Sequence, residues 1–447
     1  MSNSIGKQAV VIGAGIAGLV AARVLADYFD RVLVLERDML PGVPDHRPGT
    51  PQSRHTHTLL SGGMQALRGL FPELERQLIE SGSIILDVGL DLRSERPDYN
   101  PFPQRKTDVV SYSASRPLIE HCLQKSTRQQ SNIAFNGGQR VVSLATIADG
   151  KAVTGVRSEA AGQGIHTVAA DLVVDASGRG ALTLDLLKSL GDAAPVETAI
   201  GIDMGYTSIR FAVPDDAPAG WKAVSTGANP PHSSRAAWLW PIEGRQWLLT
   251  LLGMRGQKPP GDWGAAQDFL RSLRTRTIHD AVSRAERVDG IHRFALPSSV
   301  MRHFERLQAF PRRLLPIGDV ICRFNPFFGQ GITVAALEAL HLQRLLRERV
   351  GESDPMADLA APYFAGVQDL LTEPWSTALL DLVYPDIVGD RPANFGATLK
   401  YGASVRRLAA NDSQLHKLLL EVQHMLKPSS ALRSPEIEQR VLALMDE

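Results

Sequence analysis

The sequence predicts an α/β protein, in which a parallel sheet built from βαβ units is interleaved with an antiparallel-sheet domain and followed by a helical C-terminal region. Three observations predict this arrangement. A β-branched strand, a glycine-rich turn, a helix and a second strand follow one another over residues 9–36. Alternating apolar residues over 237–240 and 247–252 indicate antiparallel strands. Residues 351–447 carry apolar side chains at helical spacing.

The length and the charge balance limit the classes of protein to be considered. The chain has 447 residues, enough for two to three domains. Lys and Arg total 48 and Asp and Glu total 48, so the formal net charge is zero. A nucleic-acid partner requires a basic excess to neutralise phosphates, and we therefore expect none. Apolar residues at 44% and charged residues at 21% are typical of a globular protein.

The cysteine count and the first apolar run indicate in which cellular compartment the protein is expected. The chain has two cysteines, Cys122 and Cys322, which cannot build a disulfide framework, and no Cys/His cluster has zinc-ligand spacing. We therefore expect no metal site. The apolar run over 9–26 is interrupted by three glycines and Arg23, so it does not predict a membrane span. A cytoplasmic protein without membrane association is expected.

Residues 9–36 hold the complete pattern of a Rossmann-like dinucleotide-binding unit. Gly13 allows the tight turn after the first strand, and Gly15 lets the backbone approach a pyrophosphate with no Cβ in the way. Gly18 allows the helix to pack closely on the strand. The helix N-terminus then offers free N–H groups to the phosphates. Glu36 ends the second strand, where its carboxylate can accept hydrogen bonds from an adenosine ribose. The pattern alone does not separate FAD from NAD.

A second signature lies near residue 320. A short strand over 314–317 ends in Gly318-Asp319, and the loop Asn325-Pro-Phe-Phe-Gly-Gln-Gly-Ile332 opens a long helix. In both motifs the chain resembles group A flavoprotein monooxygenases, which share the fold of p-hydroxybenzoate hydroxylase. The resemblance implies that the Gly-Asp pair binds the ribityl chain and pyrophosphate of FAD. It also implies that the loop and the helix N-terminus face the flavin pyrimidine edge, where the positive helix end stabilises the negative charge of reduced flavin.

Two further segments match the same family. Residues 111–120 resemble a strand-to-helix turn whose arginine, here Arg116, touches FAD. Residues 172–178 end in Asp-Ala-Ser-Gly, whereas aromatic hydroxylases of the family have Asp-Gly there in a motif tied to FAD and NADPH. The electron donor is therefore left as NADPH or NADH, acting directly or through a separate flavin reductase. The cofactor-binding residues expected from all these motifs are Gly13, Gly15, Gly18, Glu36, Arg37, Arg116, Gly318, Asp319, Pro326, Gly329, Gln330 and Gly331.

Residues 48–60 and 70–74 narrow the resemblance to the branch with polyether-type polyene epoxidases, and more distantly to squalene epoxidase. Flavin-dependent halogenases share the fold but need an early lysine, and no lysine occurs between Lys7 and Lys106, which argues against halogenation.

His55 and His57 lie two residues apart and face one side of an extended segment. Either one of them lies near the flavin, or both are held by backbone hydrogen bonds. They are weak catalytic candidates, and no other catalytic residue is indicated.

The motif positions predict a discontinuous FAD-binding domain over 1–90, 105–195 and 295–350, with a substrate domain over 91–104 and 196–294. The proline-rich stretch 91–104 is expected to be a loop. A helical region is expected over 351–447, with helices starting at Asp354-Pro355 and Ser434-Pro435.

The resemblance implies an FAD-dependent monooxygenase that inserts one oxygen atom from O2 through a flavin C4a-hydroperoxide. Epoxidation or ring hydroxylation in secondary metabolism is expected, with O2 and an apolar small molecule as substrates, because 198–204 and 236–253 carry little charge. A separate flavin reductase is a candidate partner. Two alternatives stay open: a flavin-dependent reductase or desaturase of a prenyl or polyketide substrate, similar to geranylgeranyl reductase, and a non-catalytic FAD-binding module.

Overall fold

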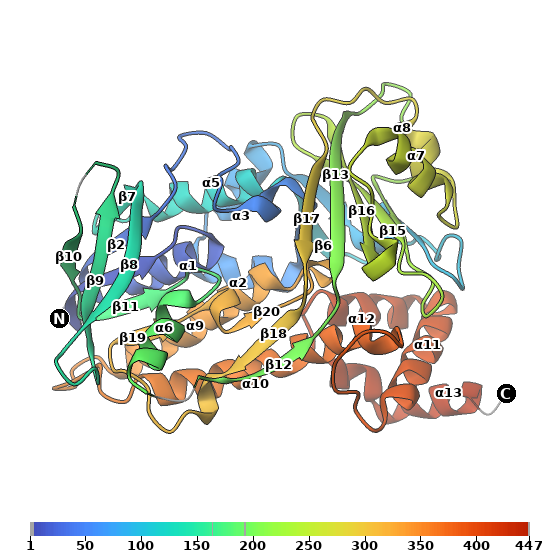
Figure 1. The fold of residues 1–447 in the computed structure, drawn as a ribbon. Coiled ribbons are helices and arrows are strands. Elements are labelled where there is room, and N and C mark those ends of the chain that lie inside the picture. Colours follow the sequence, from blue (N-terminus) through green and yellow to red (C-terminus); the bar gives the residue numbers. More distant parts are fainter. Residues whose placement is uncertain (1–3, 163, 192–193, 446–447) are drawn as a thin grey trace.

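The structure is a computed structural model that describes residues 4–162, 164–191 and 194–445. Its parallel sheet has the strand order β19–β11–β1–β2–β7 (Figure 1). The strands are β1 (Gly6–Ile12), β2 (Phe29–Glu36), β7 (Ile133–Gly137), β11 (Leu172–Asp175) and β19 (Leu314–Pro316). The apolar run that predicted β1 is buried on both faces, because helices cover one face of the sheet and a small sheet covers the other.

The helical layer packs side chains such as Val11 and Val34 against α1 (Ile16–Leu25), α5 (Arg116–Thr127) and α9 (Gly331–Glu348). On the other face, Val10 and Leu33 pack against a sheet of order β10–β9–β8. Its strands are β8 (Gln139–Thr146), β9 (Val153–Ala160) and β10 (His166–Ala169). The remaining helices of this half are α2 (Ser61–Leu70), α3 (Leu74–Glu80), α4 (Val88–Asp91) and α6 (Ala181–Ser189).

A large sheet of order β17–β13–β16–β15–β14–β5 forms the second half of the molecule (Figure 1). The strands are β5 (Leu92–Glu95), β13 (Met204–Ala212), β14 (Ala223–Thr226), β15 (Ala236–Ile242), β16 (Gln246–Met254) and β17 (His292–Leu296). All neighbouring pairs are antiparallel except β14 and β5. Helices α7 (Trp263–Arg271) and α8 (Thr277–Val282) cover its outer face. The strands predicted over 237–240 and 247–252 are thus confirmed.

Two small sheets connect the halves, with orders β3–β6–β4 and β12–β18–β20. Their strands are β3 (Thr58–Leu59), β4 (Ile84–Asp87), β6 (Val110–Ser113), β12 (Val196–Ile200), β18 (Ser299–His303) and β20 (Cys322–Arg323). The expectation that 91–104 is only a loop is wrong at its start, because Leu92–Glu95 pairs with β14 before the first proline of the stretch. The domain bounds expected from the sequence stay a prediction.

The C-terminal part contains α10 (Ala360–Ala378), α11 (Phe395–Asn411), α12 (Ser413–Gln423) and α13 (Pro435–Met445). Helix α13 starts at the predicted proline, whereas α10 starts at Ala360 and Asp354-Pro355 begins only a turn. Helices α11 to α13 lie beside the large antiparallel sheet and share a core with Phe102 (Figure 1). Over the described ranges, no helix combines the length and the apolar character needed to cross a membrane. The predicted α/β fold class, with its parallel sheet, antiparallel sheets and helical tail, is confirmed.

Candidate functional site

A cleft of about 1160 Å³ lies where the parallel strands end. The turns after β1, β11 and β19 and the end of β2 form one side, and strands β15 and β17 form the other. The chain leaves β1 for β2 on one side and returns to β11 on the other, so the cleft lies at a switch point of the sheet. Such positions are the usual ligand-binding places of open α/β sheets.

Each of the three glycines after β1 is explained by a different feature of its surroundings. Gly13 has φ +100°, and a Cβ there would lie 2.7 Å from the Ala176 carbonyl oxygen. A Cβ at Gly18 would lie 1.9 Å from the Gly13 carbonyl oxygen, so close packing of helix on turn requires glycine. Gly15, in contrast, lines the cleft, and a Cβ there would meet no atom within 4 Å. Gly15 is therefore free of internal constraint and faces the space that a ligand would fill.

Glu36 reaches the cleft but is also held by the protein. The Ala14 N–H donates to its Oε2 at 2.8 Å, and the Asp38 N–H donates to its Oε1 at 3.0 Å. The buried guanidinium of Arg47 pairs with Glu36 at 3.0 Å and with Glu120 at 2.9 Å. Arg47 was not indicated by the sequence, because its partners come from separate elements. Glu36 thus ties the glycine-rich turn to the end of β2.

Arg116 and Arg37 both line the cleft. Arg116 is the first residue of α5, and its guanidinium pairs with Glu120 at 2.7 Å. Burial raises the pKa of Glu120, but Arg116 and Arg47 outweigh this and hold it below its ordinary value. Arg37 donates to the Gly49 carbonyl oxygen at 3.4 Å. Both guanidinium groups are therefore held at the border of the cleft by contacts within the protein.

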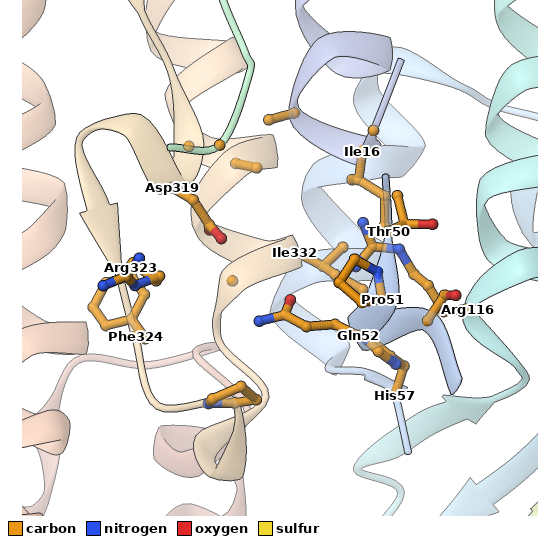
Figure 2. Close-up of a pocket in the computed structure, with 18 of the residues that line it drawn as sticks. Ile16, Thr50, Pro51, Gln52, His57, Arg116, Asp319, Arg323, Phe324 and Ile332 are labelled. Carbon is orange, nitrogen blue, oxygen red and sulfur yellow. The ribbon is translucent and has the colours of Figure 1, made fainter. Parts of the chain in front are cut away.

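The turn after β19 places Asp319 in the cleft, facing Thr50, Pro51 and Gln52 across it (Figure 2). Gly318 has φ +67°, and its N–H donates to the buried Oε2 of Glu338 at 2.6 Å. Burial raises the pKa of Asp319, while nearby arginines, first among them Arg116, oppose this rise. Glu338 lies under the turn, and burial raises its pKa to about 8. A protonated carboxyl at neutral pH thus supports the backbone of this turn.

The loop before α9 is held from below by Asn325, which is fully buried. Its Oδ1 accepts from the Tyr206 O–H at 2.8 Å and from the Phe327 N–H at 3.1 Å, and its Nδ2 donates to Asp381 at 3.0 Å. The segment Pro326–Phe328 forms a 3-10 turn that ends at Gly329 with φ +67°. This arrangement fixes the direction in which α9 begins.

Helix α9 starts at Gly331, where a Cβ would meet no atom within 4 Å. The first N–H groups of a helix have no partner within the helix, and here they open on the cleft. Oε1 of Gln330 is buried without a hydrogen-bond partner among the residues described. Pro326, Gly329, Gln330 and Gly331 all line the cleft, as do the other expected cofactor residues except Gly18.

The structure separates the two histidines. His57 lines the cleft near Arg116 (Figure 2), and its Nδ1 lies 2.9 Å from the His55 carbonyl oxygen. Since a carbonyl only accepts, Nδ1 carries the proton and Nε2 is an acceptor. Burial, followed by the charge of Arg116, lowers the pKa of His57 to about 4. His55 ends a 3-10 turn and lies 2.8 Å from the Ser208 hydroxyl instead. His57 thus borders the cleft while His55 turns to Ser208, contrary to the expectation that both face one side of an extended segment.

The end of the cleft beneath the large sheet is apolar. Trp238 and Trp240 alternate with the outward-facing Leu239 on β15, and both line the cleft. Trp238 packs on Phe327 with ring centroids 5.0 Å apart. Leu86, Val88 and Leu92 complete this wall. An apolar compartment thus adjoins the N-terminus of α9.

These residues fit FAD. Two helix N-termini, those of α1 and α9, open on one cleft, and each begins at a position where glycine leaves room for a ligand. Helix N-termini with free N–H groups suit the pyrophosphate and the anionic edge of a flavin. The unpartnered Gln330 oxygen adds a polar atom that a ligand N–H satisfies.

Comparisons with known proteins agree with this fit. A family model described as FAD dependent oxidoreductase matches residues 8–185. "Protein Rv3254" of Mycobacterium tuberculosis is 35% identical over 368 residues, covering 79% of this chain and 75% of the relative. The probable electron transfer flavoprotein-quinone oxidoreductase YdiS of Escherichia coli is 30% identical over 223 residues, 48% of each chain.

Solved structures share the fold at low sequence identity. The flavin-dependent brominase Bmp2 has a TM-score of 0.66 at 16% identity, covering 92% of this chain and 93% of its own. The flavin-dependent halogenase CmlS has a TM-score of 0.63 at 18% sequence identity, and the match covers 90% of this chain and 71% of CmlS. PqsL, a probable FAD-dependent monooxygenase from Pseudomonas aeruginosa, has a TM-score of 0.57 at 16% sequence identity, and the match covers 83% of this chain and 96% of PqsL. The chain belongs to one family with Protein Rv3254, and its residues 8–185 match the model described as FAD dependent oxidoreductase.

Proposed function

We propose that the protein is an FAD-dependent monooxygenase that transfers one oxygen atom from O2 to an apolar organic substrate, by epoxidation of an alkene or hydroxylation of a ring. The observation that carries the proposal is the continuity of the cleft: the apolar wall with Trp238 and Phe327 adjoins the N-terminus of α9. A substrate on this wall lies next to the place where the flavin ring fits. Bound FAD supplies electron transfer and the activation of O2.

In this proposal the chain positions the cofactor and shields it from water. Gly15 and Arg116 take the pyrophosphate side, Asp319 takes the ribityl chain, and Glu36 takes the adenosine ribose. The N–H groups of Gly331 and its neighbours stabilise negative charge on the reduced ring. Trp238 and Phe327 exclude water from the substrate end, which limits wasteful loss of the activated oxygen. The side chains that form the wall itself, Leu86, Val88, Leu92, Trp238, Trp240 and Phe327, are all uncharged.

Support against halogenation comes from the lining of the cleft, because no lysine borders it in the part of the chain that the structure describes. The likeness to halogenases concerns the fold alone at 16–18% identity. Placement in the polyene epoxidase branch, with a role in secondary metabolism, is part of the same proposal. NADPH or NADH is proposed as the electron donor, directly or through a separate flavin reductase as partner.

A second candidate is a flavin-dependent reductase or desaturase of a prenyl or polyketide substrate. YdiS, which is similar over 48% of this chain, is named as an oxidoreductase and not as a monooxygenase. Purified holoprotein would be supplied with NADPH or NADH, with and without a flavin reductase, and with a panel of apolar alkenes and phenols under 18O2. The monooxygenase proposal expects substrate-dependent oxygen uptake and a product that carries one 18O atom. Turnover without O2 would select the reductase, and failure of every donor to reduce the flavin would indicate a non-catalytic module.

A further inference from the structure

Arg96 places a positive charge at the apolar end of the cleft. It lines the cleft together with Trp238, Trp240 and Leu92. Its Nε donates to the Ser94 hydroxyl at 3.1 Å, and its guanidinium carbon lies 6.0 Å from the centre of the Phe102 ring. Within the described ranges of the chain, Arg96 forms no ion pair. The charge is therefore available to a ligand in the cleft.

The alternation of the chain along β5 explains why Glu95 does not neutralise Arg96. Arg96 directly follows β5 and forms an isolated bridge with Tyr99, and residues two apart on an extended segment share a face, so Ser94 and Arg96 point to the cleft while Glu95 points away. Glu95 is fully buried on the far side, where it accepts from Thr226 at 2.8 Å and from Thr277 at 2.6 Å and pairs with Arg93 at 2.8 Å. The acid next in sequence is thus already satisfied on the other face of the sheet.

The surroundings of Arg96 leave its charge poorly compensated. Burial, followed by the like charge of Arg406, lowers the pKa of Arg96 to about 10, and Asp98 opposes this only in part. The group is still a cation at neutral pH, but the protein without a ligand holds that charge at a free-energy cost. A negative group placed beside Arg96 would offset the cost. Arg96 therefore differs from Arg47 and Arg116, whose charges are matched by carboxylates.

The strand register connects Arg96 to the apolar wall. Ser94 on β5 lies opposite Ser225 on β14, and Ser225 lies opposite Trp238 on β15. A row of cleft-facing side chains thus runs from Arg96 past two serine hydroxyls to the tryptophan that packs on Phe327. A molecule that lies along this row places its anionic end at Arg96 and its apolar end near the N-terminus of α9.

We propose that the substrate is an apolar molecule with a carboxylate at one end, that Arg96 binds this carboxylate, and that the apolar body extends along Trp238 toward the flavin. A carboxylate matches a guanidinium in shape and charge, since two parallel N–H groups meet two oxygens. Arg96 is then a specificity-determining residue. This inference rests on the proposed function of the cleft, which by itself assigns only an apolar substrate.

The test measures binding and needs no turnover. FAD-loaded protein is titrated with two matched pairs of probes, decanoate with decanamide and trans-cinnamate with trans-cinnamamide, and the change in the absorbance spectrum of the bound flavin gives the dissociation constant. In each pair the apolar body is the same and only the charged end differs. We expect at least one carboxylate to bind roughly 10- to 100-fold more tightly than its amide, as for one charge-assisted hydrogen-bonded contact.

Variants assign the preference to Arg96. Arg96→Gln should remove it, and Arg96→Lys should restore part of it, because the charge stays while the paired geometry is lost. Arg271→Gln is the matched control, since Arg271 is an exposed arginine on α7, over the outer face of the same sheet. Equal binding of acids and amides, a preference that survives in Arg96→Gln, or no response to either carboxylate would overturn the inference. Any of these results leaves the monooxygenase proposal to its own 18O2 test, and a missing 18O product leaves this binding result intact.

Discussion

Replacing Gly15 by aspartate should separate the binding of FAD from the stability of the fold. Gly15 is the N-cap of α1 with φ −74° and ψ −179°, an extended conformation that any residue adopts. A Cβ at this position meets no atom within 4 Å. Aspartate is moreover a preferred N-cap residue, because its carboxylate accepts from the free N–H groups of the first turn. We therefore expect the FAD-free Gly15→Asp protein to match the wild type in unfolding free energy within about 1 kcal/mol.

The same carboxylate would stand where the pyrophosphate is proposed to bind. Two unit negative charges about 5 Å apart, at an effective dielectric constant of about 20, repel each other by about 3 kcal/mol. The side chain also occupies the N–H groups that the phosphates would use. The dissociation constant of FAD should therefore rise by about 100-fold or more.

Quenching of FAD fluorescence on titration with FAD-free protein gives the dissociation constant, and thermal melting followed by circular dichroism gives the stability. Gly256→Asp is the matched control, because a Cβ at Gly256 also meets no atom within 4 Å but Gly256 does not line the cleft. An FAD affinity of Gly15→Asp within threefold of wild type would refute the placement of the pyrophosphate. A lower melting temperature of the FAD-free variant would refute the reasoning about the fold.

Substitutions at three further positions test the supports of the cleft. Gly18→Ala should lower the unfolding free energy by about 2 kcal/mol or more in urea, since its Cβ would lie 1.9 Å from the Gly13 carbonyl oxygen, and wild-type stability would contradict this. Asn325→Ala should cost roughly 2–4 kcal/mol, because it leaves buried polar partners unsatisfied; Asn325→Asp, which keeps the acceptor, should cost less in acid. Burial raises the pKa of Glu338 from 4.5 to about 8, so its stabilising contribution is fully present below pH 4.5, falls as the pH rises from 4.5, and is lost once the pH has passed 8. Glu338→Gln should therefore gain roughly 2–4 kcal/mol relative to wild type between pH 5 and about 9 in urea unfolding, and parallel pH profiles would contradict the buried carboxyl.

Local rules were sufficient for several elements. Pro435 starts α13 as predicted, since proline at the first helical position needs no N–H partner. The turn at Gly13 and the close packing at Gly18 follow from the spacing of glycines after a buried strand. Asp354-Pro355 has the same local signal but begins only a turn, and α10 starts at Ala360. A start signal therefore shows where a helix can begin, and packing decides whether it does.

The residues that the sequence did not indicate have partners from distant parts of the chain. Arg47 joins Glu36 of β2 to Glu120 of α5, and no short pattern marks it. Glu338, in the middle of α9, reads as an ordinary helical glutamate until the fold places it under Gly318. Long-range partners are set by how helices and strands pack, which residue spacing along one segment does not record.

Three features of the protein follow from its sequence alone: the glycine-rich turn after β1, the loop that opens α9, and the neutral charge balance. Each of them depends on backbone geometry within a short segment or on composition. The separation of His57 from His55 and the exposure of Arg96 to the cleft depended on tertiary structure. Strand β5 joins the large sheet from far away in the chain, and this pairing decides that Arg96 faces the apolar wall while Glu95 faces the opposite side. Which side of a sheet a residue faces is fixed by strand pairing across the whole fold, and the substrate end of the cleft depends on that choice.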